Sequence, residues 1–422
     1  MRKLYVSIEM NGEQVPVGLI TGNSGYSAVF QYAPDYLAYP EAQPISISLP
    51  LQTEPFSSEK TRIFFEGLLP EGFLRRTVAE NNRTDHTDYL TLLELLGEEC
   101  LGAVQIRSEN ILSSPPEYRE LRQDVLEQIA AEGALKSAEL VVKAHLSLTG
   151  ASGKIGVYRS GNGQWYLPVG SAPSTHILKQ SHIRFKEIVQ NEYLCMMTAQ
   201  RLGIKVPASM LVPFKNTDDR EMILFATERY DRVLSSSKTI SGMPCPMRLH
   251  QEDFGQALGI GASEKYERGN EHQMRQMFEL LRQRSSNPIT DQLQLWDMIV
   301  LHALIGNTDG HIKNFSLLYD PSLHSIRLAP AYDIISTVIY DQHSTQMAFA
   351  IGGEIEWTAI RRSCFEAATK EIRLNTSLFM RRYDYLASHY ESALRDSAAA
   401  MTADGFPEAD ELAENILKKT LR

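Results

Sequence analysis

Three polar residues in the last part of the chain have a spacing that suits a chemical reaction. Asp309 is followed five positions later by Asn314, and Asp333 comes after a further short segment with hairpin character. An aspartate on a loop can orient a hydroxyl group and accept its proton. An asparagine oxygen and a second carboxylate can hold Mg²⁺ on the phosphates of a nucleotide. The three residues therefore have the types and the order that phosphoryl transfer requires.

The segment before Asp309 has the period of a buried helix. Apolar residues recur at helical spacing over about 290–305, so Asp309 and Asn314 are expected on a loop that leaves a buried scaffold. Residues 307–310, Asn-Thr-Asp-Gly, fit a polar turn with helix-cap chemistry equally well. A turn requires neither Asn314 nor Asp333, and the three residues together favour the catalytic interpretation.

A second candidate element is a loop of small residues upstream. Residues 147–154 read Ser-Leu-Thr-Gly-Ala-Ser-Gly-Lys and precede a strand that begins at Ile155. Backbone N–H groups in such a loop can surround phosphate oxygens, because few side chains block the approach. The loop is not a Walker A motif, since the spacing Gly-x-x-x-x-Gly-Lys-Ser/Thr is absent and a strand follows. By itself it also fits an ordinary turn.

Lys179 ends the next short strand, predicted at 175–179. A lysine on a strand after a glycine-rich hairpin can pair with nucleotide phosphates, although a solvated lysine on an edge strand would have the same pattern. The helix that follows, at about 187–202, offers Glu187 and Glu192 as carboxylate partners for Lys179, and we favour Glu192.

A linking segment at 227–232 follows the apolar strand predicted at 222–226. An extended segment between two lobes presents backbone N–H and C=O groups that can pair with an adenine edge, and Tyr230 can pack against the base. The alternative is a charged loop with local Glu–Arg pairing. The order along the chain decides between these readings, because a small-residue loop, a strand lysine, an acidic helix residue, a linker, Asp-x-x-x-x-Asn and a final Asp follow one another as in protein kinases.

Composition limits the class of protein. The chain has 422 residues, 43% hydrophobic and 22% charged, with a formal net charge of -10, which argues against binding nucleic acid over its whole surface. Its four cysteines are scattered, so neither a disulfide framework nor a structural zinc site is expected. No apolar run approaches about eighteen residues. We expect a soluble, cytoplasmic protein with no membrane contact.

The pattern of elements predicts a two-lobed, protein-kinase-like α+β fold. Alternating strands open the chain, with a hairpin at Asn11-Gly12 and further strands at 28–32 and 45–49. Beyond Asp231 we expect helices, with a single hairpin formed by 315–319 and 326–330 as the exception. The helices are predicted at about 252–260, 271–285, 290–305, 357–372, 378–400 and 407–420. The expected divisions are 1–108, an N-terminal β-rich subdomain; 109–229, the core of the N-lobe; and 230–422, the helical C-lobe.

The chain resembles the HipA-type serine/threonine kinases, which are toxins of bacterial type II toxin–antitoxin systems. The resemblance covers nearly the whole chain, and its most specific motifs are Gly-Asn-Thr-Asp-Gly-His-Ile-Lys-Asn-Phe-Ser at 306–316 and Tyr-Asp-Ile-Ile-Ser at 332–336. Supporting motifs lie at 64–70, 147–151, 175–179, 191–193, 228–232 and 251–253.

The resemblance implies a role for each matching residue. Asp309 would be the catalytic base, Asn314 and Asp333 would bind Mg²⁺, and ATP would be the phosphoryl donor. The residues that would contact ATP are Thr149, Gly150, Ala151, Ser152, Gly153, Lys154 and Lys179 at the phosphates, Glu228, Arg229 and Tyr230 at the adenine, and His311, Lys313, Asn314, Tyr332 and Asp333 beside the nucleotide. Ser147 matches the serine whose autophosphorylation silences family members. Ser152-Gly153-Lys154 stands where the family often has Gln-Glu-Lys, so Lys154 is kept and the two residues before it depart from the pattern.

The resemblance also implies a cellular role. The kinase would phosphorylate a translation-related protein, such as an aminoacyl-tRNA synthetase, and so arrest growth. Its partner would be a HipB-like helix-turn-helix antitoxin, and the kinase would contact DNA only indirectly, through that antitoxin. One alternative is a small-molecule kinase of the aminoglycoside or choline type, which shares Asp-x-x-x-x-Asn and a later Asp. Another is a non-catalytic corepressor that works with a DNA-binding antitoxin.

Overall fold

The first turn of the chain is the hairpin turn predicted at Asn11-Gly12. In the computed structural model, Asn11 and Gly12 both have positive φ, 51° and 80°, and they join β1 (Arg2–Met10) to β2 (Glu13–Gly22). Asn-Gly tolerates the left-handed backbone that a tight hairpin needs at both central positions. The predicted hairpin is confirmed.

The chain divides into two compact units, and both contain segments that are distant in sequence. Unit 1 comprises Met1–His182, Met210–Ala262 and Leu318–Ser325, and unit 2 comprises Ile183–Ser209, Ser263–Leu317 and Ile326–Arg422. The structure describes residues 1–109, 114–132, 136–137, 139–140, 154–180, 187–215, 221–269, 271–341 and 344–421. The predicted boundaries after 108 and 229 remain predictions.

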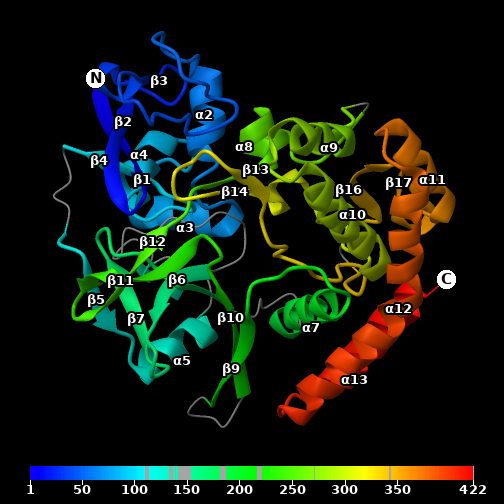
Figure 1. Ribbon diagram of the computed structural model, residues 1–422. Coiled ribbons are helices and arrows are strands. Elements are labelled where there is room, and N and C mark those ends of the chain that lie inside the picture. The colour runs from blue at the N-terminus through cyan, green and yellow to red at the C-terminus, as the bar shows by residue number, and fades with distance from the viewer. Residues whose placement is uncertain are drawn as a thin grey trace. The chain divides into compact units, whose positions relative to one another are not determined.

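The N-terminal part of unit 1 is a four-stranded antiparallel sheet in the order β3-β2-β1-β4, coloured blue to cyan in Figure 1. Its further elements are β3 (Val29–Tyr32), β4 (Val104–Ser108), α1 (Pro34–Leu37), α2 (Ser58–Glu66), α3 (Gly72–Asn81) and α4 (Tyr89–Leu96). Phe30 of the sheet packs against Phe65 of α2, with ring centroids 5.2 Å apart and both side chains fully buried. Burial of these large rings holds the helix on the sheet.

The strand predicted at 45–49 is wrong. Ser46 and Leu49 form an isolated bridge, and the segment is a buried turn. The polar groups of this segment bond to the Glu252 side chain instead of to a neighbouring strand. The Glu252 carboxylate accepts hydrogen bonds from Ser46 Oγ at 2.5 Å and from the Ile47 N–H at 3.1 Å. The alternating pattern of the segment reflects burial on one side of a turn.

A second sheet of unit 1 has six strands in the order β5-β7-β6-β8-β10-β9. Its members are β5 (Glu117–Glu120), β6 (Lys154–Arg159), β7 (Trp165–Val169), β8 (His176–Gln180), β9 (Ser209–Lys215) and β10 (Glu221–Glu228), with α5 (Gln123–Glu132) packed near β10. The strand predicted to begin at Ile155 and the strands predicted at 175–179 and 222–226 all belong to this sheet, and β8 lies in its interior, not at an edge.

Beyond Asp231, the expectation that one hairpin is the single exception among the helices is also wrong. β11 (Arg232–Ile240) pairs with β12 (Met243–Arg248), and further strands are β13 (Gln251–Asp253), β16 (Gln346–Ile351) and β17 (Glu354–Glu356). Polar and apolar residues alternate only weakly in β11 and β12, so the sequence carries little periodic signal that would predict these strands. The predicted hairpin is present as β14 (Ser316–Tyr319) and β15 (Ile326–Leu328). The predicted helix at 252–260 is the short α8 (Phe254–Leu258).

Unit 2 is mainly helical, and α10 lies at its centre. Trp296 of α10 is fully buried between Phe365 of α11 and Phe379 of α12, with T-shaped ring contacts at 5.5 and 5.4 Å. The long α12, orange to red in Figure 1, packs against α13, α7 and α10. The helices are α7 (Ile188–Arg201), α9 (Gln273–Arg284), α10 (Pro288–Ile305), α11 (Arg362–Glu371), α12 (Thr376–Ala403) and α13 (Glu408–Thr420), with short 3₁₀ turns η1 (Ala262–Glu264), η2 (Ile312–Asn314) and η3 (Trp357–Ala359).

These helices agree with the predicted periods, except that the segment predicted at 357–372 is divided into η3 and α11. Within the described ranges, no helix combines the length and the hydrophobicity that crossing a bilayer requires.

Candidate active site

The loop that carries Asp309 begins where α10 ends. Gly306 terminates the helix with a left-handed φ of 67°, and a side chain there would collide with Val338 Cγ2 at 2.4 Å. Gly310 is equally restricted, because a Cβ atom would lie 2.1 Å from His302 Nδ1. The two glycines therefore allow the loop to pass close over the end of α10, with Asp309 between them.

Thr337 holds the first half of this loop. Its hydroxyl accepts a hydrogen bond from the Thr308 N–H at 2.9 Å, lies 2.8 Å from Thr308 Oγ1 and donates to the Gly306 carbonyl at 2.9 Å. The backbone N–H of Thr337 donates to the same carbonyl at 3.1 Å. A buried threonine from a segment near Asp333 thus fixes the residue directly before Asp309.

The second half of the loop is closed by Asn314. The Asn314 side-chain amide donates to the backbone carbonyl of Asp309 at 3.0 Å, and the His311 N–H donates to the same carbonyl at 2.8 Å. Only the NH₂ group of an asparagine can donate to a carbonyl, so Oδ1 of Asn314 is left as an acceptor. An amide oxygen is a suitable ligand for Mg²⁺.

Asp333 has a left-handed backbone conformation, which is uncommon outside glycine. Its φ is 56°, a left-handed value that costs on the order of 1 kcal/mol outside glycine and that occurs often at functional sites. The segment after it is anchored to α7, where the Asn191 side chain donates to the Ser336 carbonyl at 2.8 Å and accepts from the Ser336 N–H at 3.1 Å. Before Asp333, the Tyr332 hydroxyl donates to the Lys313 carbonyl at 3.0 Å. The segment 332–337 is therefore tied to the loop 306–314.

His302 lies buried beneath this arrangement. Burial lowers its pKa to about 4, although the nearby charge of Asp333 acts in the opposite direction. Neither ring nitrogen of His302 has a hydrogen-bond partner among the described residues. The imidazole is thus neutral at physiological pH and serves as packing under Gly310.

In unit 1, the structure pairs two of the predicted phosphate ligands. Lys154 of β6 and Lys179 of β8 are direct cross-strand partners in an antiparallel ladder, and Lys179 is buried, with Nζ 5.9 Å from the centre of the Phe225 ring. Residues directly opposite on antiparallel strands point to the same face, and like charges there destabilise the pair. A nucleotide phosphate on this face would be attracted to both charges, so the two lysines fit the predicted phosphate site.

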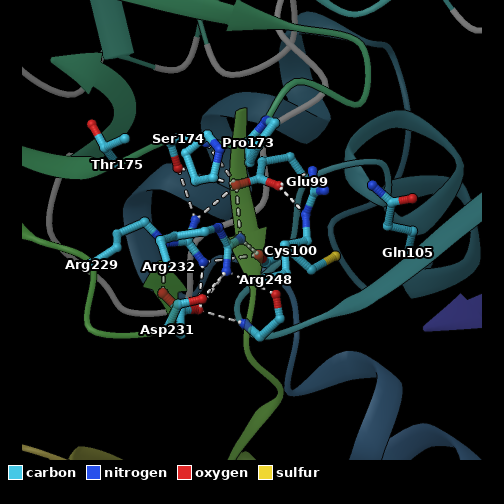
Figure 2. Close-up of polar contacts among 12 residues, drawn as sticks. Glu99, Cys100, Gln105, Pro173, Ser174, Thr175, Arg229, Asp231, Arg232 and Arg248 are labelled. Atoms are coloured by element: carbon cyan, nitrogen blue, oxygen red, sulfur yellow. Dashed lines mark hydrogen bonds and ion pairs between the residues drawn. The ribbon is translucent and has the colours of Figure 1, made fainter. Parts of the chain in front are cut away.

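The segment 228–230 is held by an ion network. Glu228 ends β10 and is exposed, and the Tyr230 hydroxyl bonds to Gln251. Arg229 is buried, and its N–H groups all donate: to Asp231 twice, to Glu99, to Ser174 Oγ and to the Cys100 carbonyl, at 2.7–3.1 Å (Figure 2). All five donors of a guanidinium are thereby used. The structure thus places the Arg229 side chain in the protein interior, where the neighbouring Asp231 and the sequence-distant Glu99 hold the segment.

The network contains further buried charges. Glu99, fully buried, also accepts from Arg232 at 2.8 Å and from Arg248 at 2.7 Å. Burial by itself would raise the pKa of Glu99, but the charges of Arg232, Arg248 and Arg229 lower it to about 2. Asp231 accepts from Arg232 and from the Gly102 N–H at 2.7 Å, and its pKa is lowered in the same way. The network joins Glu99, which lies between α4 and β4, to Arg229 and Asp231, which lie between β10 and the next strand (Figure 2).

Several predictions of site residues lie outside the described residues: Ser147, Thr149, Gly150, Ala151, Ser152 and Gly153. Of the others, Asp309, His311, Lys313, Asn314, Tyr332 and Asp333 come together in unit 2, whereas Lys154, Lys179, Glu228, Arg229 and Tyr230 belong to unit 1. Glu192 is buried on α7 in unit 2, and its pairing with Lys179 remains a prediction.

The sequence patterns did not reveal three residues that shape this site. Thr337 and Asn191 position its backbone, and the Tyr266 hydroxyl donates to Asp309 Oδ1. Asn191 stood in a recognised motif but without a role, and neither Thr337 nor Tyr266 has a spacing that signals chemistry. In the described ranges, no group of three or more His, Cys, Asp or Glu side chains is arranged to hold a metal ion. Mg²⁺ in nucleotide sites needs only one or two protein carboxylates besides the phosphates, so Asn314 and Asp333 still fit it.

Comparison with known proteins identifies the family. Residues 8–107 match the HipA N-terminal domain and residues 146–404 match the HipA-like C-terminal domain. The chain belongs to the HipA family. The HipA family relatives include "Putative kinase Y4mE" of Sinorhizobium fredii, 32% identical over 90% of this chain and 88% of that protein. The serine/threonine-protein kinase toxin HipA of Shewanella oneidensis is 26% identical over 75% of this chain and 72% of the toxin.

A solved structure shares the HipA fold. The HipA chain in a complex of HipA, HipB and operator DNA from Shewanella oneidensis has a TM-score of 0.79 and 21% identity, covering 98% of this chain and 96% of that one. The predicted family and the two-lobed kinase-like α+β fold class are confirmed. The relatives also support the predicted enzyme class, a serine/threonine protein kinase.

Proposed function

We propose that this HipA-family protein is an ATP- and Mg²⁺-dependent serine/threonine protein kinase, the toxin of a toxin–antitoxin module. Its target would be a translation-related protein such as an aminoacyl-tRNA synthetase, and phosphorylation of that target would arrest growth. The observation that carries the proposal is the hydrogen bond from Asn314 to the Asp309 carbonyl, because it gives one loop both a proton acceptor and a metal-facing oxygen.

The residues of unit 2 would act on the acceptor and the metal. The Asp309 carboxylate would orient the acceptor hydroxyl and take its proton. Asn314 Oδ1 and the Asp333 carboxylate would hold Mg²⁺, which when bound neutralises charge on the transferring phosphoryl group. The strained backbone of Asp333 and the Asn191 anchor support this, because both keep the Asp333 segment in one position.

The residues of unit 1 would bind the nucleotide. Lys154 and Lys179, opposite each other on β6 and β8, would neutralise phosphate oxygens. Glu228 and Tyr230 would line the adenine site. Arg229 would hold this segment in place through the ion network. His311, Lys313 and Tyr332 would lie beside the nucleotide.

The test of the function uses the purified protein with labelled ATP, Mg²⁺ and a bacterial lysate. We expect label in one or a few proteins, and Asp309→Asn should lose at least about a hundredfold in rate, since a general base contributes about 10²–10⁴. Asp309→Asn is chosen because it keeps the size of the side chain. Label found only in small molecules would favour an aminoglycoside- or choline-type kinase, and undiminished labelling by Asp309→Asn would exclude the assigned base.

The off-switch is a separate part of the proposal. Ser147 would be autophosphorylated, and a phosphate of about -1.5 to -2 charge near bound ATP would repel it. Ser147→Ala should lose the main phosphopeptide of the protein incubated with Mg²⁺ and ATP, with Ser171→Ala as a control. An unchanged phosphopeptide map would contradict the switch.

The proposed partner is a HipB-like antitoxin. The solved HipA neighbour was determined with HipB and operator DNA, which supports such a partner here, with DNA contacted through it. A corepressor role in that complex is compatible with catalysis, and Asp309→Asn would separate the two, since it should abolish phosphoryl transfer and leave repression intact.

A further inference from the structure

The carboxylate of Asp309 is already engaged within unit 2. The hydroxyl of Tyr266 donates a hydrogen bond to Asp309 Oδ1. The Tyr266 ring meets the His311 ring edge to face, with centroids 5.2 Å apart and an interplanar angle of 82°. The Tyr266 hydroxyl is therefore hydrogen-bonded to the carboxylate that is proposed to receive the proton of the acceptor hydroxyl.

Tyr266 has little structural need for this contact. The residue is 37% exposed, so water could satisfy its hydroxyl, and its ring adds little to the buried core. Lys265 Nζ lies 5.5 Å from the centre of the same ring. The hydrogen bond is thus better explained by the chemistry of Asp309 than by folding.

The backbone beside Tyr266 is anchored, and the Tyr266 side chain is partly exposed. Glu267 is buried, its N–H donates to the Ala348 carbonyl at 2.8 Å, and its carboxylate accepts from the N–H groups of His272 at 3.0 Å and Ala350 at 3.1 Å. The main chain is therefore anchored one residue after Tyr266. A partly exposed side chain on such an anchor can change rotamer in picoseconds to nanoseconds without movement of the loop.

We propose, resting on the function proposed above, that Tyr266 is an acceptor gate. Its hydroxyl occupies the place of the acceptor hydroxyl on Asp309 while no protein acceptor is bound, and the serine or threonine of the acceptor displaces it. The same contact keeps water from Asp309, so that ATP is not hydrolysed in the absence of an acceptor. Tyr266 thereby determines which hydroxyl the kinase accepts: one whose binding outweighs the tyrosine contact.

The test compares Tyr266→Phe with wild type, since Phe keeps the ring and its contact with His311. Two rates are measured: release of inorganic phosphate from Mg²⁺ and ATP without acceptor, and transfer to the protein identified from the lysate. We expect phosphate release to rise and the KM for the acceptor to fall, each about two- to tenfold, because one net hydrogen bond no longer has to be displaced. The kcat for transfer should stay within about twofold.

The matched control is Tyr385→Phe. Tyr385 is 39% exposed in the same unit, and among the described residues its hydroxyl has no hydrogen bond. That variant should match wild type in both rates. A fall in kcat for Tyr266→Phe with unchanged phosphate release would mean that Tyr266 supports the base, and unchanged rates would mean that it has no part; either result overturns the gate. Transfer that does not depend on Asp309 would instead overturn the proposed function itself.

Discussion

The side-chain amide of Asn314 donates a hydrogen bond to the backbone carbonyl of Asp309 over 3.0 Å. This contact explains the five-residue spacing of the pair, because η2 brings Asn314 back toward the start of the loop. The two residues are thus one structural element and would move together. Changes elsewhere in unit 2 that loosen the loop should therefore affect proton acceptance and metal binding at the same time.

Thr337→Val should slow catalysis more than it destabilises the fold. The substitution leaves the buried Thr308 N–H without its acceptor, which costs about 1–3 kcal/mol, and it releases the residue before Asp309. We expect kcat to fall about ten- to a hundredfold, since a misplacement of about 1 Å is costly. The control Thr337→Ser keeps the hydroxyl. Equal kcat values for the two variants would show that this hydroxyl does not position the loop.

Lys154→Met and Lys179→Met should each weaken ATP binding. Each removes one of two charges on the same face of β6 and β8, and we expect the Kd for ATP to rise about tenfold, equivalent to about 1.4 kcal/mol. Calorimetric titration of the purified protein measures this without any activity. Lys370→Met, an exposed lysine on α11, is the control. A Kd that neither lysine alters would place the phosphates elsewhere.

Glu99→Gln should strongly destabilise unit 1. It removes a buried charge that faces Arg229, Arg232 and Arg248, and loss of one partner from a buried ion pair costs about 3–5 kcal/mol. Thermal unfolding should show a fall of several degrees in Tm. Glu391→Gln removes an exposed partner of Arg395 and should change stability by less than about 1 kcal/mol. Similar Tm values for both variants would contradict the importance of the network.

Glu252 should make stability depend on pH between about 4.5 and 7. Burial raises its pKa from 4.5 to about 7, although hydrogen bonds from Ser46 and Tyr319 act in the opposite direction. The folded state then holds the proton more tightly than the unfolded state. Its contribution to stability is therefore complete below about pH 4.5 and is lost as the pH rises through about 7.

Glu252→Gln mimics the protonated side chain and should flatten this dependence. At pH 8 the variant should be more stable than wild type by on the order of 1–3 kcal/mol, as measured by denaturant unfolding across the pH range. Glu80→Gln, an exposed glutamate of α3, should keep the wild-type curve. Parallel curves for wild type and Glu252→Gln would show that folding does not raise the pKa of Glu252.

Local patterns predicted the parts of this fold that local forces determine. The Asn11-Gly12 hairpin follows from backbone preference, and the long helices follow from apolar period. One failure occurred where a distant side chain replaced a local partner. Residues 45–49 look like a strand, but Glu252 satisfies their polar groups from about two hundred positions away in sequence.

The candidate site divides in the same way. The sequence by itself determined the Asp309–Asn314 pair, because both residues lie on one short loop and their contact depends only on its turn. Only the tertiary structure decided that Thr337 holds this loop, that Asn191 anchors the segment after Asp333, and that Tyr266 bonds to Asp309. It also decided that buried carboxylates enclose Arg229. These contacts join segments that are remote along the chain. Burial and packing bring such segments together, and no spacing along a sequence records that outcome.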